Sequence, residues 1–148
     1  MKKHLVLLVE DNPSDVALAQ RAFSKSSISV DLMVVEDGQE ALDYLFGGGS
    51  QKRYEGNAMP SLVLLDLKLP RVDGMEVLRR IRADQRTSRL PVVILTTSNE
   101  ERDVAQSYDL GANSYIRKPV DFTQFAEFVQ HLGLYWLVMN ESALPKGA

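Results

Sequence analysis

Polar residues that could bind a cation or a phosphoryl group stand directly after short apolar runs of this 148-residue chain. Continuous runs rich in Val, Ile and Leu are typical of strands that are buried on both faces of a parallel sheet. The carboxyl ends of such strands border the ligand crevice of an open α/β sheet, so we expect these polar side chains to gather at one edge. They are Glu10 and Asp11 after residues 5–9, Asp66 after Leu62–Leu65, Thr96 after residues 92–95, and Lys118 shortly after Tyr115 and Ile116.

Taken singly, each of these residues has an ordinary structural explanation. Glu10 and Asp11 could be acidic residues at the positive end of a helix, and Asp66 could be a turn residue. Thr96 could be a β-branched strand residue, and Lys118 could lie in a solvated turn. Their shared position after predicted inner strands favours a joint explanation, in which carboxylates, a hydroxyl and an ammonium meet. Such a set suits a divalent cation together with a phosphoryl group.

Expected strands and helices alternate along the chain. This alternation predicts an α/β fold, a doubly wound five-stranded parallel sheet with helices on both faces. We find no internal repeat and no domain boundary in the sequence. The expected strands are residues 5–9, Val30–Val35, Leu62–Leu65, 92–95 and 114–116. The first expected helix starts at Pro13 with Asn12 as its cap, the second includes residues 41–46, and the third starts at Gly74. The fourth follows a cap at Asn99, and the fifth follows a cap at Asp121 and continues to about Met139.

Composition and charge argue against several classes of protein. A length of 148 residues with 45% hydrophobic content fits one compact domain with a substantial core. The net charge of −3 and the scattered basic residues argue against a nucleic-acid partner. The lack of cysteine removes disulfides, zinc-thiolate sites and thiol nucleophiles. The first apolar run is too short for a signal peptide or a membrane span, so we expect a cytoplasmic protein with no membrane partner.

Several short motifs follow one another in a fixed order. They are Glu10-Asp11-Asn12, Asp66, Leu69-Pro70-Arg71-Val72-Asp73-Gly74, Thr96, Gly111-Ala112-Asn113, Tyr115 and Lys118-Pro119. This ordered set resembles the receiver domain of two-component response regulators, from about residue 5 to residue 132. The resemblance implies a flavodoxin-like fold with strand order 2-1-3-4-5 and five flanking helices. It also implies a single receiver domain over residues 1–148, with a core at about 5–132, a C-terminal helix extension and tail at about 133–148, and no separate DNA-binding domain.

The resemblance implies a role for each carboxylate at this edge. Asp66 would accept a phosphoryl group from a phosphohistidine of a partner histidine kinase, forming a labile acyl phosphate. Asp11, Asp66 and the backbone carbonyl of Lys68 would bind Mg²⁺ directly, and Glu10 would reach the ion directly or through water. The protein would then be a signalling domain that promotes its own phosphorylation and dephosphorylation, rather than an enzyme.

The resemblance also implies a phosphoryl-binding pair and a switch. Lys118 would contact the phosphoryl oxygens, and the Thr96 hydroxyl would donate a hydrogen bond to one of them. In the family the hydroxyl-bearing strand end moves inward on phosphorylation and an aromatic residue of the last strand rotates, and Thr96 and Tyr115 hold those positions. Tyr115 could equally be a packing aromatic at a sheet edge. Phosphorylation would bias binding of an unidentified protein target as a population shift.

Two positions depart from the common pattern of the family. Lys68, two residues after the expected nucleophile, could overhang the site and tune hydrolysis, or its side chain could point to solvent. Thr97 is bulkier than the Ala or Gly often found after the switch threonine, and it could narrow the access to Asp66.

The C-terminal stretch carries more apolar surface than one helix needs to dock on a sheet. Its residues are Phe125, Phe128, Val129, Leu132, Tyr135, Trp136 and Met139. We expect a homodimer through the last strand and the C-terminal helix, centred on Tyr135 and Trp136. Together with the long stretch 47–60, residues 95–98 and the ending 143–145, this extension resembles stand-alone regulators that serve phytochrome-type histidine kinases.

Two rival functions remain at this point. A haloacid-dehalogenase-like phosphatase also uses a strand-end aspartate as nucleophile, but it normally needs a second acid two residues later, where this chain has Lys68. A flavin-binding flavodoxin shares the fold, but Glu10 and Asp11 would repel the phosphate of its cofactor. An Mg²⁺-dependent acyl phosphate would separate the receiver from both.

Overall fold

Strands and helices alternate throughout the computed structural model, which describes residues 4–47, 59–97, 100–118 and 121–132. The strands are β1 (His4–Val9), β2 (Val30–Val35), β3 (Leu62–Leu65), β4 (Val92–Thr96) and β5 (Ser114–Arg117). The helices are α1 (Pro13–Ser24), α2 (Gly38–Phe46), α3 (Gly74–Ala83), α4 (Glu101–Asp109) and α5 (Phe122–Leu132). The predicted elements are confirmed within these residues, with small shifts at the ends of β1, β4 and β5.

The strands form one parallel sheet in the order β2-β1-β3-β4-β5, which confirms the predicted order. The register aligns the carboxyl ends of the three central strands, because Val9 lies opposite Leu65 and Leu65 lies opposite Ile94. The Asp66 backbone N–H continues this ladder by donating to the Val9 carbonyl at 3.1 Å. The residues that follow β1 therefore lie beside the residues that follow β3.

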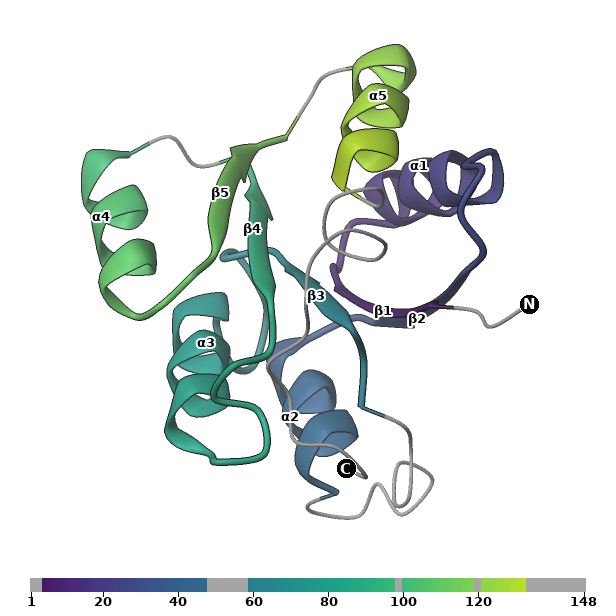
Figure 1. Cartoon of the computed structure of the whole chain (residues 1–148). Coiled ribbons are helices and arrows are strands. Elements are labelled where there is room, and N and C mark those ends of the chain that lie inside the picture. Colours follow the sequence, from purple (N-terminus) through teal and green to yellow (C-terminus); the bar gives the residue numbers. More distant parts are fainter. Residues whose placement is uncertain (1–3, 48–58, 98–99, 119–120, 133–148) are drawn as a thin grey trace.

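Helices cover both faces of the sheet (Figure 1), with α1 and α5 side by side on one face and α2 and α3 on the other. Successive strand residues point to opposite faces, so each strand contributes to two cores. Leu7, Val63 and Ile94 belong to the core beneath α2 and α3. Leu8 and Leu64 belong to the core beneath α1 and α5. Burial on both faces explains why these strands are continuous apolar runs without polar alternation.

Polar caps fix the starts of the helices that flank the site. The Asn12 Oδ1 atom accepts hydrogen bonds from the backbone N–H groups of Ser14 at 2.9 Å and Asp15 at 3.2 Å, as predicted for this cap. The Asp121 Oδ1 atom accepts one from the Gln124 N–H at 2.8 Å. The predicted cap residue Asn99 lies outside the described residues; α4 starts at Glu101, and Glu100 holds the cap position without a side-chain bond.

Two glycines let the β3–α3 loop pass close to its neighbours. A Cβ atom on Gly74 would lie 2.2 Å from the Asp66 carbonyl oxygen, and one on Gly38 would lie 1.8 Å from the Val72 carbonyl oxygen. No larger residue fits either position without moving the backbone. Between these contacts Arg71 adopts a left-handed conformation with φ of 68°, and its guanidinium lies 3.4 Å from an Asp37 carboxylate oxygen. The loop that follows Asp66 is thus fixed by backbone contacts.

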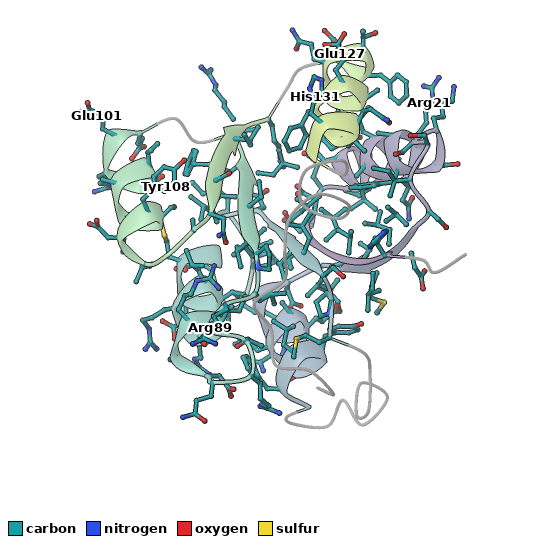
Figure 2. The ribbon with its side chains drawn as sticks, viewed as in Figure 1. Arg21, Arg89, Glu101, Tyr108, Glu127 and His131 are labelled. Carbon is teal, nitrogen blue, oxygen red and sulfur yellow. The ribbon has the colours of Figure 1, made fainter. Side chains whose placement is uncertain are left out.

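Polar side chains of the helices, including Glu101, Glu127 and His131, point outward from the layers (Figure 2). Within the described residues no helix is both long enough and apolar enough to cross a membrane. Some sequence-based expectations lie outside the described residues, namely the extension with Tyr135, Trp136 and Met139, and most of the stretch 47–60.

Candidate functional site

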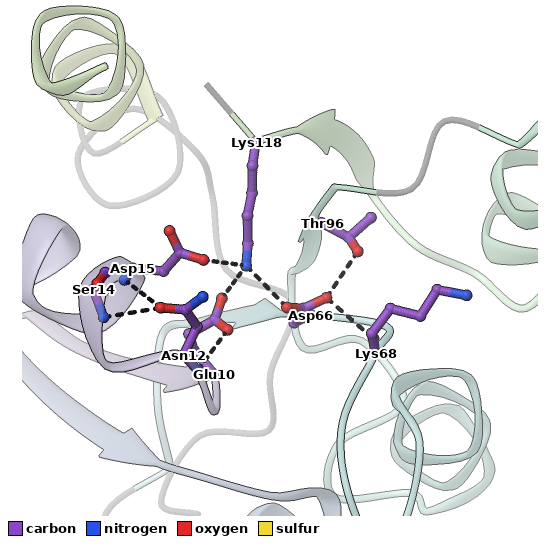
Figure 3. A network of polar contacts seen from close by, with 8 residues as sticks. All are labelled: Glu10, Asn12, Ser14, Asp15, Asp66, Lys68, Thr96 and Lys118. Carbon is purple, nitrogen blue, oxygen red and sulfur yellow. Dashed lines mark hydrogen bonds and ion pairs between the residues drawn. The ribbon is translucent and has the colours of Figure 1, made fainter. Parts of the chain in front are cut away.

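The carboxyl ends of four strands bring the predicted polar residues together (Figure 3). Glu10 follows β1, Asp66 follows β3, Thr96 is the last residue of β4, and Lys118 follows β5. The side chains of Glu10, Asp66 and Thr96 are buried, whereas Asp11 is exposed. The predicted gathering at one edge of the sheet is therefore confirmed for these residues.

Lys118 lies at the centre of the cluster and contacts three carboxylates. Its Nζ atom lies 2.5 Å from Glu10 Oε1, 2.8 Å from Asp15 Oδ2 and 2.9 Å from Asp66 Oδ2. Its side chain is only 9% exposed, and those of Glu10 and Asp66 are 3% and 7% exposed. Ion pairs this deeply buried lose little strength to solvent screening, so the cluster is a strong electrostatic feature.

The carboxylate of Asp66 is held at both oxygens. Asp66 Oδ1 accepts hydrogen bonds from the Thr96 hydroxyl at 2.7 Å and from the Lys68 backbone N–H at 3.1 Å. Asp66 Oδ2 accepts from the Lys118 ammonium at 2.9 Å. These donors would stabilise negative charge that develops on or next to Asp66.

The charges in the cluster shift one another's protonation. Burial raises the pKa of Glu10 from 4.5 to about 7; the hydrogen bond from Lys118 opposes this rise, and the nearby charge of Asp66 adds to it. Burial alone would lower the pKa of Lys118, but the hydrogen bonds to Asp15, Glu10 and Asp66 outweigh burial and raise that pKa above its ordinary value. The ammonium therefore keeps its charge at neutral pH.

Three carboxylates at this edge form a group that could hold a metal ion. One oxygen each of Glu10, Asp11 and Asp66 lies within 4.8 Å of the others. Hard anionic oxygens are the ligands that Mg²⁺ and Mn²⁺ prefer, and few protein ligands leave room for water and phosphate oxygens. The donor set therefore fits a divalent cation. The backbone carbonyl of Lys68 as a further ligand stays a prediction.

An open hollow of about 470 Å³ borders the site on the side of Asp11. It is lined by Asp11, Leu67, Lys68, Leu69, Pro70, Asp73, Met75 and Asp103. The Lys68 side chain extends away from the Asp66 carboxylate (Figure 3), so only its backbone N–H contacts Asp66 in this structure. Of the two orientations that the sequence left open for Lys68, the structure has the outward one.

Tyr115 lies on the edge strand β5. It is partly buried against the core beneath α2 and α3. Its backbone N–H donates to the Tyr108 hydroxyl of α4 at 3.2 Å. The backbone of Tyr115 is thus tied to α4, and its role in switching remains a prediction.

Asp15 contacts Lys118 in this network, and the sequence reasoning did not single it out. It contacts Lys118 from the first turn of α1, three residues after the Asn12 cap. An acidic residue at that position is common because it complements the helix dipole, so the residue type gave no reason to single it out. Its place next to the end of β1 was the available signal, because the first turn of α1 rises from the same edge as Glu10.

A family model described as the response regulator receiver domain matches residues 6–130 of the chain. The chain therefore belongs to the receiver domains of response regulators, the phosphoryl-accepting class of protein in two-component signalling. The predicted family and fold are confirmed, and neither the phosphatase nor the flavodoxin alternative gains support.

Regulatory proteins from an archaeon and a cyanobacterium are among the relatives of this chain. The probable methanogenesis regulatory protein FilR2 of Methanothrix harundinacea is 41% identical over 143 residues, which cover 95% of this chain and 88% of that protein. Response regulator Rcp1 of Synechocystis is 40% identical over 133 residues, 90% of this chain and 88% of that protein. The Mn²⁺-bound crystal structure of response regulator Rcp1 superposes with a TM-score of 0.84 at 39% identity, covering 96% of this chain and 99% of that one.

A phytochrome response regulator has a similar structure. The crystal structure of the phosphorylated cyanobacterial phytochrome response regulator RcpA superposes with a TM-score of 0.88 at 39% identity, and it covers 96% of this chain and 99% of that chain. This similarity agrees with the narrower resemblance to phytochrome-associated response regulators.

Proposed function

We propose that Asp66 is the phosphoacceptor of this receiver domain. The observation that carries the proposal is the orientation of its carboxylate, which is fixed by Thr96 and the Lys68 N–H on one oxygen and by Lys118 on the other. Asp66 also adjoins the hollow on the Asp11 side, through which a phosphodonor could approach.

The chemistry follows from these contacts. A carboxylate oxygen of Asp66 would form a bond to phosphorus while the phosphorus–nitrogen bond of a phosphohistidine breaks, and the imidazole nitrogen would keep the electron pair. Lys118 and Thr96, which now donate to Asp66, would turn to the phosphoryl oxygens and stabilise their charge. Attack of water on phosphorus would later release inorganic phosphate and restore the carboxylate.

The cation of the site would be Mg²⁺, held by Glu10, Asp11, Asp66 and the Lys68 carbonyl. The close approach of three carboxylate oxygens supports this assignment. A bound Mg²⁺ neutralises charge on the transferred phosphoryl group. The cation and Lys118 would together balance the negative charge of the carboxylates and of the phosphoryl group.

We assign the wider signalling roles on the same basis. The phosphodonor would be a cytoplasmic sensor histidine kinase, in keeping with the phytochrome response regulators among the similar structures. Thr96 and Tyr115 would report phosphorylation to the surface formed by β4, β5, α4 and α5. That surface would bind the downstream target, and the chain would form a homodimer through β5 and the C-terminal helix. The domain would turn over no separate substrate.

Incubation with acetyl phosphate, with and without Mg²⁺, tests the proposal by intact-mass spectrometry. We expect one phosphoryl group per chain, formed only with Mg²⁺ and absent in Asp66→Asn. A phosphoryl group that persists in Asp66→Asn places the acceptor elsewhere and contradicts the proposal. Turnover of small phosphoesters would favour a phosphatase. Light scattering of both forms tests the dimer, because a monomer in both contradicts it.

A further inference from the structure

Asp15 contacts Lys118 but is separate from the carboxylates that could hold a cation. Its Oδ2 atom lies 2.8 Å from Lys118 Nζ, while the close group of metal-binding oxygens consists of Glu10, Asp11 and Asp66. Figure 3 shows the Lys118 ammonium between Asp15 on one side and Asp66 on the other. The lysine thus has one anionic partner that a cation in the carboxylate group would leave free.

The ammonium uses all of its donors in this arrangement. It has three N–H groups, and it contacts three carboxylates, those of Glu10, Asp15 and Asp66. Two of these, Glu10 and Asp66, also belong to the group that could bind Mg²⁺. A carboxylate oxygen that coordinates a cation is a weaker hydrogen-bond acceptor for the ammonium, so the two positive charges compete for Glu10 and Asp66.

Asp15 is well placed to relieve this competition. Its backbone N–H donates to the Asn12 cap at 3.2 Å, which fixes the residue in the first turn of α1. A cavity that Asp15, Lys118 and Phe125 help to line has a volume of only about 10 Å³, room for about one water molecule between the two charged side chains and the apolar core. Of the three carboxylates that Lys118 contacts, only those of Glu10 and Asp66 would be left without Asp15.

We propose that Asp15 is a positioning residue that holds the Lys118 ammonium beside the site when Glu10 and Asp66 turn to a divalent cation. The inference rests on the proposed cation site and adds a residue to it. Asp15 keeps the ammonium within reach of a phosphoryl group on Asp66 and keeps it from blocking the metal ligands. Asp15 would therefore affect Mg²⁺ binding only by holding Lys118, and not as a ligand of the ion.

Titration with Mg²⁺ alone, followed by calorimetry, tests the inference. We expect Asp15→Ala to weaken Mg²⁺ binding about 3- to 10-fold, within the usual range of coupling between contacting groups. Asp15→Asn, which keeps an acceptor oxygen without the charge, should lie in between. Glu76→Gln is the matched control, because Glu76 also stands three residues after its cap and forms ion pairs, but with Arg79 and Arg80 away from the site. It should leave Mg²⁺ binding unchanged.

The same titration in a Lys118→Met background decides how Asp15 acts. If Asp15 acts through the ammonium, Asp15→Ala has no further effect on Mg²⁺ binding in that background. An equal loss in both backgrounds would mean that Asp15 acts only as a distant charge, and it overturns the inference. Unchanged or tighter binding in Asp15→Ala alone overturns it too. If the unsubstituted chain binds no Mg²⁺, the proposed cation site itself fails.

A spectroscopic measurement keeps the test independent of the stability of Lys118→Met. In protein labelled with ¹⁵N-lysine, an ammonium held by hydrogen bonds gives a resolved Nζ signal because its protons exchange slowly. We expect the Lys118 signal to persist at saturating Mg²⁺ in the unsubstituted chain and in Glu76→Gln, and to be lost in Asp15→Ala. Persistence in Asp15→Ala at saturating Mg²⁺ contradicts a holding role for Asp15.

Discussion

Replacing Lys118 by Met tests how strongly the buried carboxylates depend on the ammonium. Two nearly buried partners lie at 2.5 Å and 2.9 Å from Nζ, and each such pair has a gross attraction of about 6 kcal/mol at an effective dielectric constant near 20. Desolvation of the charges offsets much of this attraction, and breaking a buried ion pair from one side costs about 3–5 kcal/mol. Asp15, whose side chain is 32% exposed, adds little to this cost because water can solvate it.

We therefore expect Lys118→Met to lower the free energy of unfolding by about 3–5 kcal/mol in metal-free buffer. In a domain of this size that corresponds to a fall in Tm of roughly 6–20 °C. Urea unfolding without metal measures the loss, provided that the dependence on urea concentration is unchanged. Lys68→Met is the matched control, since Lys68 is an exposed lysine at the same edge, and a change of no more than about 0.5 kcal/mol is expected.

A second substitution checks the reasoning. If unpaired buried charge is the cause, Glu10→Gln should cost less stability in the Lys118→Met background than in the unsubstituted chain, because it also relieves repulsion from Asp66. A Lys118→Met variant as stable as the unsubstituted chain in metal-free buffer would refute the argument. That result would mean that the cost of burying the ammonium equals all that its three contacts contribute.

Three further predictions concern the metal, the loop and the pH dependence. At about 100 times its dissociation constant Mg²⁺ should stabilise the chain by roughly 2.7 kcal/mol, and thermal melting should show this shift lost in Asp11→Ala, whose exposed side chain is not needed for folding. Gly74→Ala should lower stability in urea by about 1–3 kcal/mol or more, because its Cβ would meet the Asp66 carbonyl oxygen, whereas Ala83→Gly in the same helix should cost only about 1 kcal/mol. Hydrogen bonds from Arg79 and Arg80 lower the pKa of Glu76 from 4.5 to about 2, so its contribution is present above about pH 4.5 and is lost as the pH falls toward 2. The stability advantage over Glu76→Gln should accordingly shrink over that range in acid titrations followed by circular dichroism, and an advantage that is independent of pH contradicts this reasoning.

The parallel sheet and the position of its polar residues could be predicted because local pattern and topology agree. Runs such as Leu62–Leu65 are apolar on both faces, and that continuity is specific to inner strands. The alternation with helices then puts Glu10, Asp66 and Thr96 at one edge. The strand order itself needed the family resemblance, since periodicity does not say which strands are neighbours.

Other features depend on distances that no local pattern encodes. The contact between Asp15 and Lys118 joins residues 103 positions apart, and it depends on how α1 leans over the end of the sheet. The cap position of α4 is a second example, because Glu100 holds it without a side-chain hydrogen bond, and capping preferences give no signal for such a residue. The outward path of the exposed Lys68 side chain is likewise a choice between rotamers, which the residue type does not specify.

The hydrogen bond between α4 and the outer strand has a consequence for how copies of this chain meet. An edge strand offers open backbone groups on which another strand can add, and this is a common route to aggregation. On β5 the Tyr108 hydroxyl accepts the hydrogen bond from the Tyr115 N–H, and α4 lies alongside. While α4 keeps this place, strand addition at Tyr115 is blocked. Contacts between copies on this side would then form through side chains, whose fit can depend on the state of the site.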